Sequence, residues 1–172
     1  MGRRGFDSIV SPSVKRLLIP LVLLVAPLAS VLASAPAVVV RDADTGHAFL
    51  CGPAPGGQEL TLTFSHSMYG GLVEETFKVD GHDLVRTGVR AERAAAAEYY
   101  GMYGDVLADA GWFRVIVTPL PIRDLRFVAD GIGHHEIRIG SKGWRTGDSP
   151  PPLHVSVRVE DISPGRRREW DC

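Results

Sequence analysis

The sequence predicts an all-β protein, a mostly antiparallel β-sandwich or open barrel with one short helix, preceded by an N-terminal hydrophobic helix. Three observations support this prediction. Apolar and polar residues alternate in several short segments, which is the period of a half-buried strand. Gly-Gly and Asp-Gly pairs lie between such segments and supply the positive φ of two-residue hairpin turns. From about residue 36 onwards, short strand-like segments follow one another with turn residues between them, as in a sandwich or barrel.

Residues 1–35 are expected to form a signal peptide or a signal anchor. The segment 17–40 has no charged side chain and follows a basic flank made of Arg3, Arg4, Lys15 and Arg16. An uncharged apolar stretch of this length can cross a bilayer, and small residues up to Ala33 fit a cleavage site. A basic flank before the apolar stretch places the N-terminus in the cytoplasm and the rest outside. We therefore expect an extracytoplasmic protein, secreted or anchored to the cell membrane by this segment.

The β domain is expected over residues 36–160, followed by a basic tail at 161–172. Strands at 37–41 and 47–51 flank a turn rich in Asp. Two hairpins follow within residues 60–86. An Ala-rich stretch at 91–100 predicts a short helix, and glycines after it predict a loop at 101–111. Further strands, each with one apolar parity, are predicted at 112–118, 124–129, 134–139 and 153–159.

The two hairpins fix a register if their turns have two residues each. A turn at Gly70 and Gly71 places Phe64 opposite Phe77, Leu62 opposite Val79 and His66 opposite Glu75. A turn at Asp80 and Gly81 places Phe77 opposite Leu84 and Glu75 opposite Arg86. The result is a three-strand meander with a transverse row of His66, Glu75 and Arg86 among apolar neighbours. Side chains that oppose each other across antiparallel strands are close enough to interact.

This row is the candidate site, and several functions fit it. A carboxylate beside an imidazole can form a general-base pair, half of a metal site or a ligand clamp. It can also belong to a structural network that Arg86 completes. Ser67 should point away from His66, since neighbouring strand residues face opposite sides, and this disfavours a serine hydrolase. We expect a binding site that includes His66, Ser67, Glu75, Arg86 and Tyr100, the last from an aromatic loop.

No catalytic residue, metal ligand or cofactor is assigned from the sequence. A zinc site made by His66, His135 and Glu75 is conceivable, but no spacing requires it. A net charge of -1 argues against a nucleic-acid-binding protein, which needs a basic face. The two cysteines, Cys51 and Cys172, either form a disulfide or remain as a buried thiol and a tail thiol.

Residues 64–68 and 73–77 carry a motif that resembles the bacterial domain-of-unknown-function family 1850. His66, Ser67 and Glu75 stand at the places of the family's His-Ser and Glu. The similarity extends over residues 38–159, although Gly71 and Leu72 replace the family's Thr-Pro. The resemblance implies a small exported protein, often encoded beside tripartite solute transporters of the TAXI type, and it assigns no catalytic activity.

Together these observations predict an exported or membrane-anchored β protein that binds a small solute or a subunit of a TRAP-type transporter. The alternative is an extracytoplasmic hydrolase that uses a His/Glu or metal site. A third class is a purely structural envelope module. A binding module should show a pocket walled by aromatic residues. An enzyme should expose His66 and Glu75 together in a cleft, and a structural module should bury the whole row.

Overall fold

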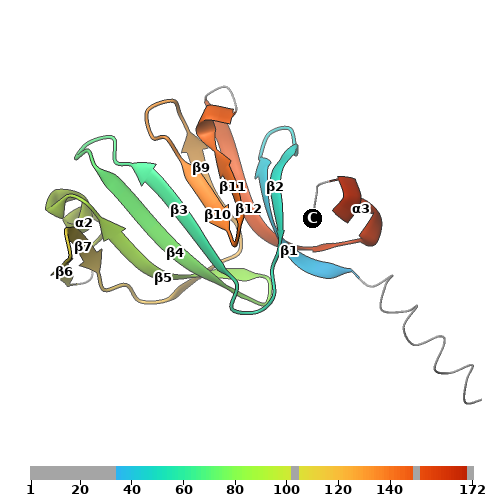
Figure 1. Cartoon of the computed structure of the whole chain (residues 1–172), viewed down its shortest axis with the longest axis horizontal. Coiled ribbons are helices and arrows are strands. Elements are labelled where there is room, and N and C mark those ends of the chain that lie inside the picture. The colour runs from blue at the N-terminus through green and yellow to red at the C-terminus, as the bar shows by residue number, and fades with distance from the viewer. Residues whose placement is uncertain (1–33, 102–104, 149–151, 170–172) are drawn as a thin grey trace, which may run out of the picture. The chain divides into compact units, whose positions relative to one another are not determined.

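The computed structural model describes residues 34–101, 105–148 and 152–169. The predicted signal segment and Cys172 therefore lie outside the described residues. Among the residues described, no helix is both long enough and apolar enough to cross a membrane. The described part forms an all-β domain with antiparallel sheets (Figure 1), which confirms the all-β part of the predicted fold class.

The strands form two antiparallel sheets. Along the smaller sheet the order is β2 (Ala48–Pro53), β1 (Ala35–Asp42), β12 (Leu153–Ile162) and β9 (Leu125–Ala129). The larger sheet runs through β11 (Lys142–Arg145), β10 (Glu136–Ile139), β3 (Glu59–Ser65), β4 (Leu72–Asp80), β5 (Asp83–Ala91), β7 (Trp112–Val115) and β6 (Val106–Asp109). The short strand β8 (Leu120–Ile122) pairs with the other end of β5. Three short helices are described, namely α2 (Ala94–Tyr100), the 3-10 turn η1 (Thr146–Asp148) and α3 (Pro164–Glu169).

The two sheets share one hydrophobic core, as expected for a sandwich. Alternating residues of β1 and β12 pack against alternating residues of β3, β4 and β10. Phe77, Leu60 and Leu84 are the largest of the fully buried side chains. The apolar parity predicted for residues 125–129 and 153–159 is the buried or half-buried one. Burial of this apolar surface is the main favourable term in folding.

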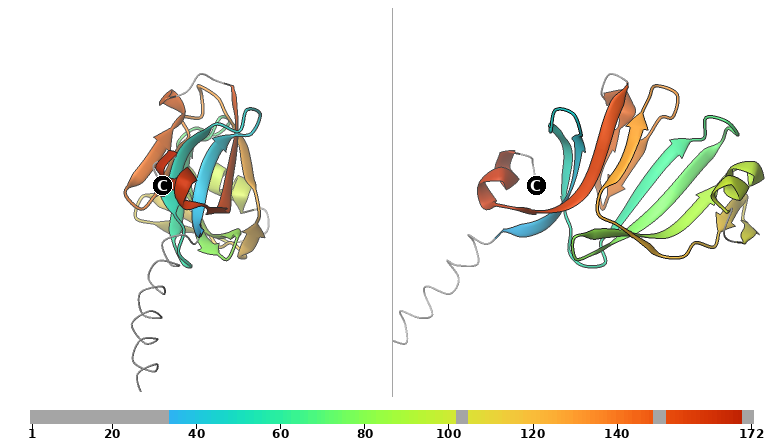
Figure 2. Two further views of the ribbon diagram at one scale, coloured as in Figure 1. Left: turned by 90° about the vertical axis from the view of Figure 1, so that its right-hand side faces the viewer. Right: turned by 180° about the vertical axis from the view of Figure 1, so that it is seen from behind.

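A second, smaller core lies where α2 covers one end of the larger sheet (Figures 1 and 2). Ala96 and Ala97 of this helix pack against Val73, Val89 and Val115. The absence of bulky side chains on these alanines lets the helix approach the strands closely. The helix thereby ends at Tyr100, beside the predicted site.

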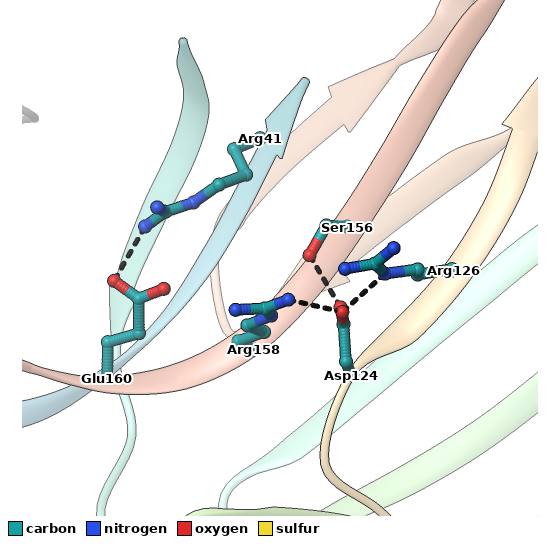
Figure 3. Close-up of polar contacts among 6 residues, drawn as sticks. All are labelled: Arg41, Asp124, Arg126, Ser156, Arg158 and Glu160. Carbon is teal, nitrogen blue, oxygen red and sulfur yellow. Dashed lines mark hydrogen bonds and ion pairs between the residues drawn. The ribbon is translucent and has the colours of Figure 1, made fainter. Parts of the chain in front are cut away.

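The outer face of the smaller sheet carries a polar network (Figure 3). Asp124, just before β9, accepts hydrogen bonds from Ser156 at 2.5 Å, from Arg158 at 2.5 Å and from Arg126. On the same face Arg41 of β1 donates to Glu160 of β12 at 2.6 Å. Although partial burial opposes ionisation, the hydrogen bonds from Arg158, Ser156 and Arg126 hold the pKa of Asp124 well below its usual range.

Cys51 of β2 is buried on the same side of this sheet, beside Val39 and Ile162. It is disulfide-bonded, which decides between the two expectations for this residue. The only other cysteine of the sequence, Cys172, lies outside the described residues.

The meander of β3, β4 and β5 is confirmed, but the register predicted for its first hairpin is wrong. Ser65 pairs with Leu72, so Phe64 faces Val73 and Leu62 faces Glu75. Gly70 and Gly71 both have positive φ, yet they end a longer loop at 66–71. In this loop the His66 N–H donates to the Gly71 carbonyl at 3.0 Å, and the Gly70 N–H donates to the His66 carbonyl at 2.9 Å.

The predicted register differs from the observed one by an even number of residues. The side chains that were predicted to point inward therefore still do so. Phe64 was expected opposite Phe77 and lies opposite Val73, four positions earlier in the chain. Side chains alternate across a strand with a period of two. An even shift therefore keeps Leu60, Leu62 and Phe77 on the core face, where they are buried. His66 itself is not a strand residue, so it is not opposite Glu75.

The second hairpin also differs from the prediction. Its turn is Gly81 and His82, with Asp80 paired to Asp83. Further along, a β-bulge shifts the register, so that Phe77 faces Arg86 but Thr76 faces Gly88. The predicted pairing of Glu75 with Arg86 is thus wrong, and Glu75 lies opposite Val89. The bulge inserts one extra residue into β5 and transfers its inward side chains from Leu84 and Arg86 to Val89 and Ala91.

Several other elements differ from the sequence prediction. Strand β6 occupies part of the expected loop at 101–111, and β8 and β11 were not predicted. Strand β12 continues to Ile162, and α3 follows within the expected basic tail. The predicted helix is shorter at its start and spans Ala94–Tyr100.

Candidate functional site

His66 occupies the start of the loop between β3 and β4 and is 8% exposed. Its Nδ1 atom lies 3.2 Å from the backbone nitrogen of Met68 and 3.3 Å from that of Tyr69, and it accepts from both. A ring nitrogen that accepts N–H groups carries no proton, so this pattern assigns the proton of a neutral His66 to Nε2. The loop therefore fixes both the orientation and the tautomer of the ring.

Three tyrosines surround the His66 ring. The ring centroids lie 5.0 Å from Tyr69, 5.4 Å from Tyr99 and 6.2 Å from Tyr100. The last two are nearly perpendicular to the imidazole, with interplanar angles of 82° and 85°. Edge-to-face contacts of this kind are favourable aromatic arrangements. Tyr99 and Tyr100 end helix α2, so the packing of the helix on the sheet positions them.

A cavity of about 290 Å³ opens beside this cluster. The loop at 66–71 contributes His66, Ser67 and Met68, and helix α2 contributes Tyr99 and Tyr100. The remaining wall comes from the end of β3 and the β9–β10 connection, with Phe64, Ser65, Val128, Asp130, Gly133 and His135. Concave sites with aromatic walls and a few polar groups are typical of small-molecule binding. We refer to it as the His66 cavity.

His135 forms part of one wall of the His66 cavity. Its ring stacks between Phe64, at 5.5 Å, and Phe127, at 4.9 Å, and both interplanar angles are close to 20°. Burial lowers the pKa of His135, an effect that the negative charge of Asp130 opposes and that His134 reinforces. The Nδ1 atom of His135 is buried and finds no hydrogen-bond partner within the described part of the chain.

Asp130 holds the β9–β10 connection in place. Its Oδ1 accepts from the backbone nitrogens of Ile132, at 3.1 Å, and Gly133, at 2.7 Å. The bond from Gly133 is the largest influence on the carboxyl and lowers its pKa, so Asp130 is ionised at neutral pH. The Gly133 carbonyl accepts from the Ser65 N–H at 2.7 Å and ties this connection to the end of β3.

Glu75 and Arg86 lie deeper in the sheet and are in weak contact. Glu75 Oε2 is 3.5 Å from Arg86 Nη1, and the two side chains are 12% and 29% exposed. Burial raises the pKa of Glu75 and outweighs the attraction of Arg86.

Tyr100 lies between the two parts of the predicted site. It lines the His66 cavity on one side and a second cavity of about 220 Å³ that includes Arg86 on the other. Burial raises the pKa of Tyr100, with smaller contributions in the same direction from Glu75 and Tyr99. The structure therefore brings His66, Ser67 and Tyr100 to one cavity, and Arg86 and Tyr100 to the other. Glu75 lines neither of these two cavities.

The geometry does not assemble the His/Glu pair that the alternative, a hydrolase, would use. Neither Glu75 nor Ser67 is among the hydrogen-bond partners of His66 in the described part of the chain. A neutral imidazole acts as a general base through its unprotonated nitrogen. In His66 that nitrogen is Nδ1, and it already accepts from the backbone N–H groups of Met68 and Tyr69. The suggested zinc ligands do not come together either, since the described residues contain no group of three His, Cys, Asp or Glu side chains able to hold a metal ion.

Five residues around His66 were not predicted as binding residues, namely Tyr69, Tyr99, Asp130, Phe64 and His135. The signals for some of them were present. Asp130 is followed at a short distance by two glycines, a composition typical of a turn in which the Asp side chain accepts backbone N–H groups. The contact between that turn and the end of β3 could not be seen, because it joins residues far apart in the chain.

Comparisons of this chain with known protein families, with curated proteins and with solved structures gave no match. The resemblance to family 1850 accordingly stays an expectation based on the motif around His66 and Glu75.

Proposed function

We propose that this protein is an exported or membrane-anchored binding module that holds a small solute in the His66 cavity as an accessory of a TRAP-type transporter. The observation that supports binding most directly is the aromatic wall around a fixed imidazole. Tyr99, Tyr100 and Phe64 offer flat apolar surfaces, while His66 Nε2–H and the Asp130 carboxylate offer a donor and an acceptor.

The charge of the cavity limits the solutes that fit. Asp130 is ionised, the burial of His135 favours its neutral form, and Tyr100 stays protonated. The lining thus carries negative charge at neutral pH. It suits a neutral or cationic solute that has a flat or apolar part for the tyrosines and a donor for Asp130.

The location and the partner rest on the sequence. The basic flank before residues 17–40 favours a β domain outside the cytoplasm. The link to a TRAP-type transporter comes from the resemblance around His66 and Glu75. A reporter fused after Ile162 tests the location, because an extracytoplasmic domain should activate alkaline phosphatase and leave a cytoplasmic reporter inactive.

Binding is tested with the full-length chain purified from the envelope fraction in a nonionic detergent. Native mass spectrometry should detect a co-purifying small molecule, and a panel of neutral and cationic solutes should contain compounds that raise the melting temperature. Tyr99→Ala should abolish both the co-purification of a small molecule and the rise in melting temperature. Leu107→Ala is the matched control, since both residues are large, apolar and about half exposed, at 51% and 43%. Equal responses of Tyr99→Ala and the native chain to every solute would contradict the proposal.

A further inference from the structure

The second cavity results from a gap in the pairing of strand β5. One end of β5 pairs with β7 through Val89–Ala91, and the other end pairs with β8 through Leu84–Arg86. Between β7 and β8, residues 116–119 leave the sheet. The β-bulge in β5 lies at the same place. A cavity of about 220 Å³ remains there, lined by Arg86, Tyr100 and residues 116–120.

Among the described residues that line this cavity, Arg86 is the only charged one. Its contact with Glu75 uses Nη1 and is long, at 3.5 Å. Its Nε atom is buried and has no hydrogen-bond partner among the residues that the structure describes. A guanidinium has five N–H donors in a planar fork. Glu75 therefore leaves the edge formed by Nε and Nη2 unused.

Arg90, four residues further along β5, shows how a carboxylate binds the Nε and Nη2 edge of a guanidinium. Arg90 Nε donates to Glu74 Oε1 at 2.7 Å, and Arg90 Nη2 donates to Glu74 Oε2 at 2.9 Å. This is the bidentate arrangement that makes arginine–carboxylate pairs strong. The partner of Arg86 on the other face, Glu75, is too far and too buried to reach the same geometry.

The rest of the lining is mainly apolar. Ile116, Val117, Pro119 and Leu120 provide an aliphatic surface, and Thr118 contributes one hydroxyl. The phenol of Tyr100 stays neutral because burial and the nearby Glu75 raise its pKa, so it does not repel an anion. A cation with free donors at one side of a small apolar cavity is complementary to a carboxylate with a short aliphatic tail.

We propose that this cavity binds a short-chain organic carboxylate, with the carboxylate accepting hydrogen bonds from Arg86 and the tail packed on residues 116–120. The site differs from the His66 cavity in its charge and its ligand class, and Tyr100 is the wall that the two share. It does not depend on the solute proposed for the His66 cavity.

The test uses the full-length chain in nonionic detergent and butanoate labelled with ¹³C at the carboxyl carbon. Titration should shift the ¹³C resonance in a saturable way, while detergent micelles alone should not. Unlabelled butanoate should displace the probe, whereas butan-1-ol and butylammonium, which lack a carboxylate, should not. A linear, non-saturable response would overturn the inference.

Two substitutions at Arg86 locate the site. Arg86→Gln should weaken butanoate binding by about tenfold or more, the effect of losing hydrogen bonds to a charged group. Arg86→Lys keeps the positive charge but loses the planar fork, and should weaken binding by about fivefold. The control is Arg123→Gln, an arginine 71% exposed that pairs with Asp83, and it should leave the affinity within about twofold.

The lysine variant also covers the case in which Arg86→Gln fails to fold, as checked by circular dichroism. An unchanged affinity in a folded variant at Arg86 would overturn the inference, and so would an equal loss in Arg123→Gln. Tyr99→Ala should bind butanoate normally. Binding that depends on Tyr99 and not on Arg86 would place the carboxylate in the His66 cavity, which contradicts this inference while supporting a ligand site at His66.

Discussion

Glu75 and Arg86 contact each other diagonally across neighbouring strands, with 3.5 Å between Oε2 and Nη1, and neither is opposite the other. Glu75 faces Val89, and Arg86 faces Phe77, because the bulge in β5 lies between the two pairs. The diagonal position leaves the carboxylate buried without a short ion pair. The consequence is a raised pKa of Glu75, in which burial is the largest cause.

Glu75→Gln should therefore change how stability depends on pH. A folded-state pKa above the ordinary value of 4.5 means that the native state binds more protons than the unfolded state at pH values above 4.5. The free energy of unfolding then falls as pH rises from 4.5 through the folded-state pKa. Gln does not titrate, so the variant should gain stability relative to the native chain over this window. Urea unfolding between pH 4.5 and 7.5 measures the difference.

Glu74→Gln is the control for this experiment, since Glu74 is the next residue of β4 and pairs with Arg90 on the opposite face. It should not reproduce the gain. A Glu75→Gln variant whose stability relative to the native chain is constant from pH 4.5 to 7.5 would show that folding does not raise the pKa of Glu75.

His135→Phe should remove a pH dependence of the opposite sign. Burial between Phe64 and Phe127 lowers the pKa of His135 below its ordinary value of 6.5, so the native state binds fewer protons than the unfolded state below that pH. The free energy of unfolding is then lost as pH falls from 6.5 through the folded-state pKa. Phe keeps the stacked arrangement and has no proton to bind. The variant should be less sensitive to acid between pH 6.5 and 5 in urea unfolding.

The same substitution at an exposed histidine is the control. His82→Phe lies on the turn between β4 and β5, where the side chain is 43% exposed. It should leave the acid sensitivity of the domain in place. Loss of the pH dependence in His82→Phe and not in His135→Phe would refute the assignment.

Asp124→Asn should destabilise the domain by about 1–2 kcal/mol, because it weakens charge-assisted hydrogen bonds from Arg158 and Arg126. The low pKa of Asp124 means that its contribution is complete above pH 3.8 and is lost as pH falls below that value. Chemical denaturation at pH 7 gives the magnitude. Asp83→Asn, whose partner Arg123 is 3.5 Å away at an exposed position, should cost less than about 0.5 kcal/mol. Equal effects of the two substitutions would count against the network of Figure 3.

Gly71→Ala should be more harmful than Gly70→Ala, although both residues have positive φ, 75° and 63°. The left-handed conformation costs a non-glycine residue about 1–2 kcal/mol at either position. At Gly71 the added Cβ would also lie 2.8 Å from Arg93 Cγ, whereas at Gly70 it meets no atom within 4 Å. The melting temperature should fall further for Gly71→Ala. A larger fall for Gly70→Ala would mean that the loop at 66–71 is arranged differently.

The sequence was sufficient to predict the class of fold, because the alternation of apolar and polar residues shows which side chains point inward even when the strand register is wrong. The alternation in residues 60–64 and 73–79 specifies which side chains point inward whatever the length of the turn, provided the error is even. The turn chemistry indicated where the chain reverses but not how many residues the loop contains. Gly70 and Gly71 fit a two-residue turn by composition, and the backbone bonds of His66 favour a longer loop.

The candidate site was predictable only in part, for the same reason. His66, Ser67 and Tyr100 do meet at one cavity. Arg86 belongs to a different cavity. Its position could not be predicted, because neither the bulge in β5 nor the gap between β7 and β8 has a signature in the local sequence. His135 and Asp130 reach the His66 cavity through pairing between β10 and β3, which alternation along a single strand does not reveal.

The bulge in β5 lets one strand serve two hydrophobic cores. Before the bulge, Leu84 contributes to the core shared by the two sheets, and after it Val89 and Ala91 contribute to the core beneath α2. The extra residue acts like a phase shift in a periodic pattern. If β5 kept its sequence but paired with β4 without the bulge, Thr87 would face Thr76 and every later residue would change sides. Val89 and Ala91 would then turn to solvent, and Arg90 would turn inward beneath the helix that carries Tyr99 and Tyr100.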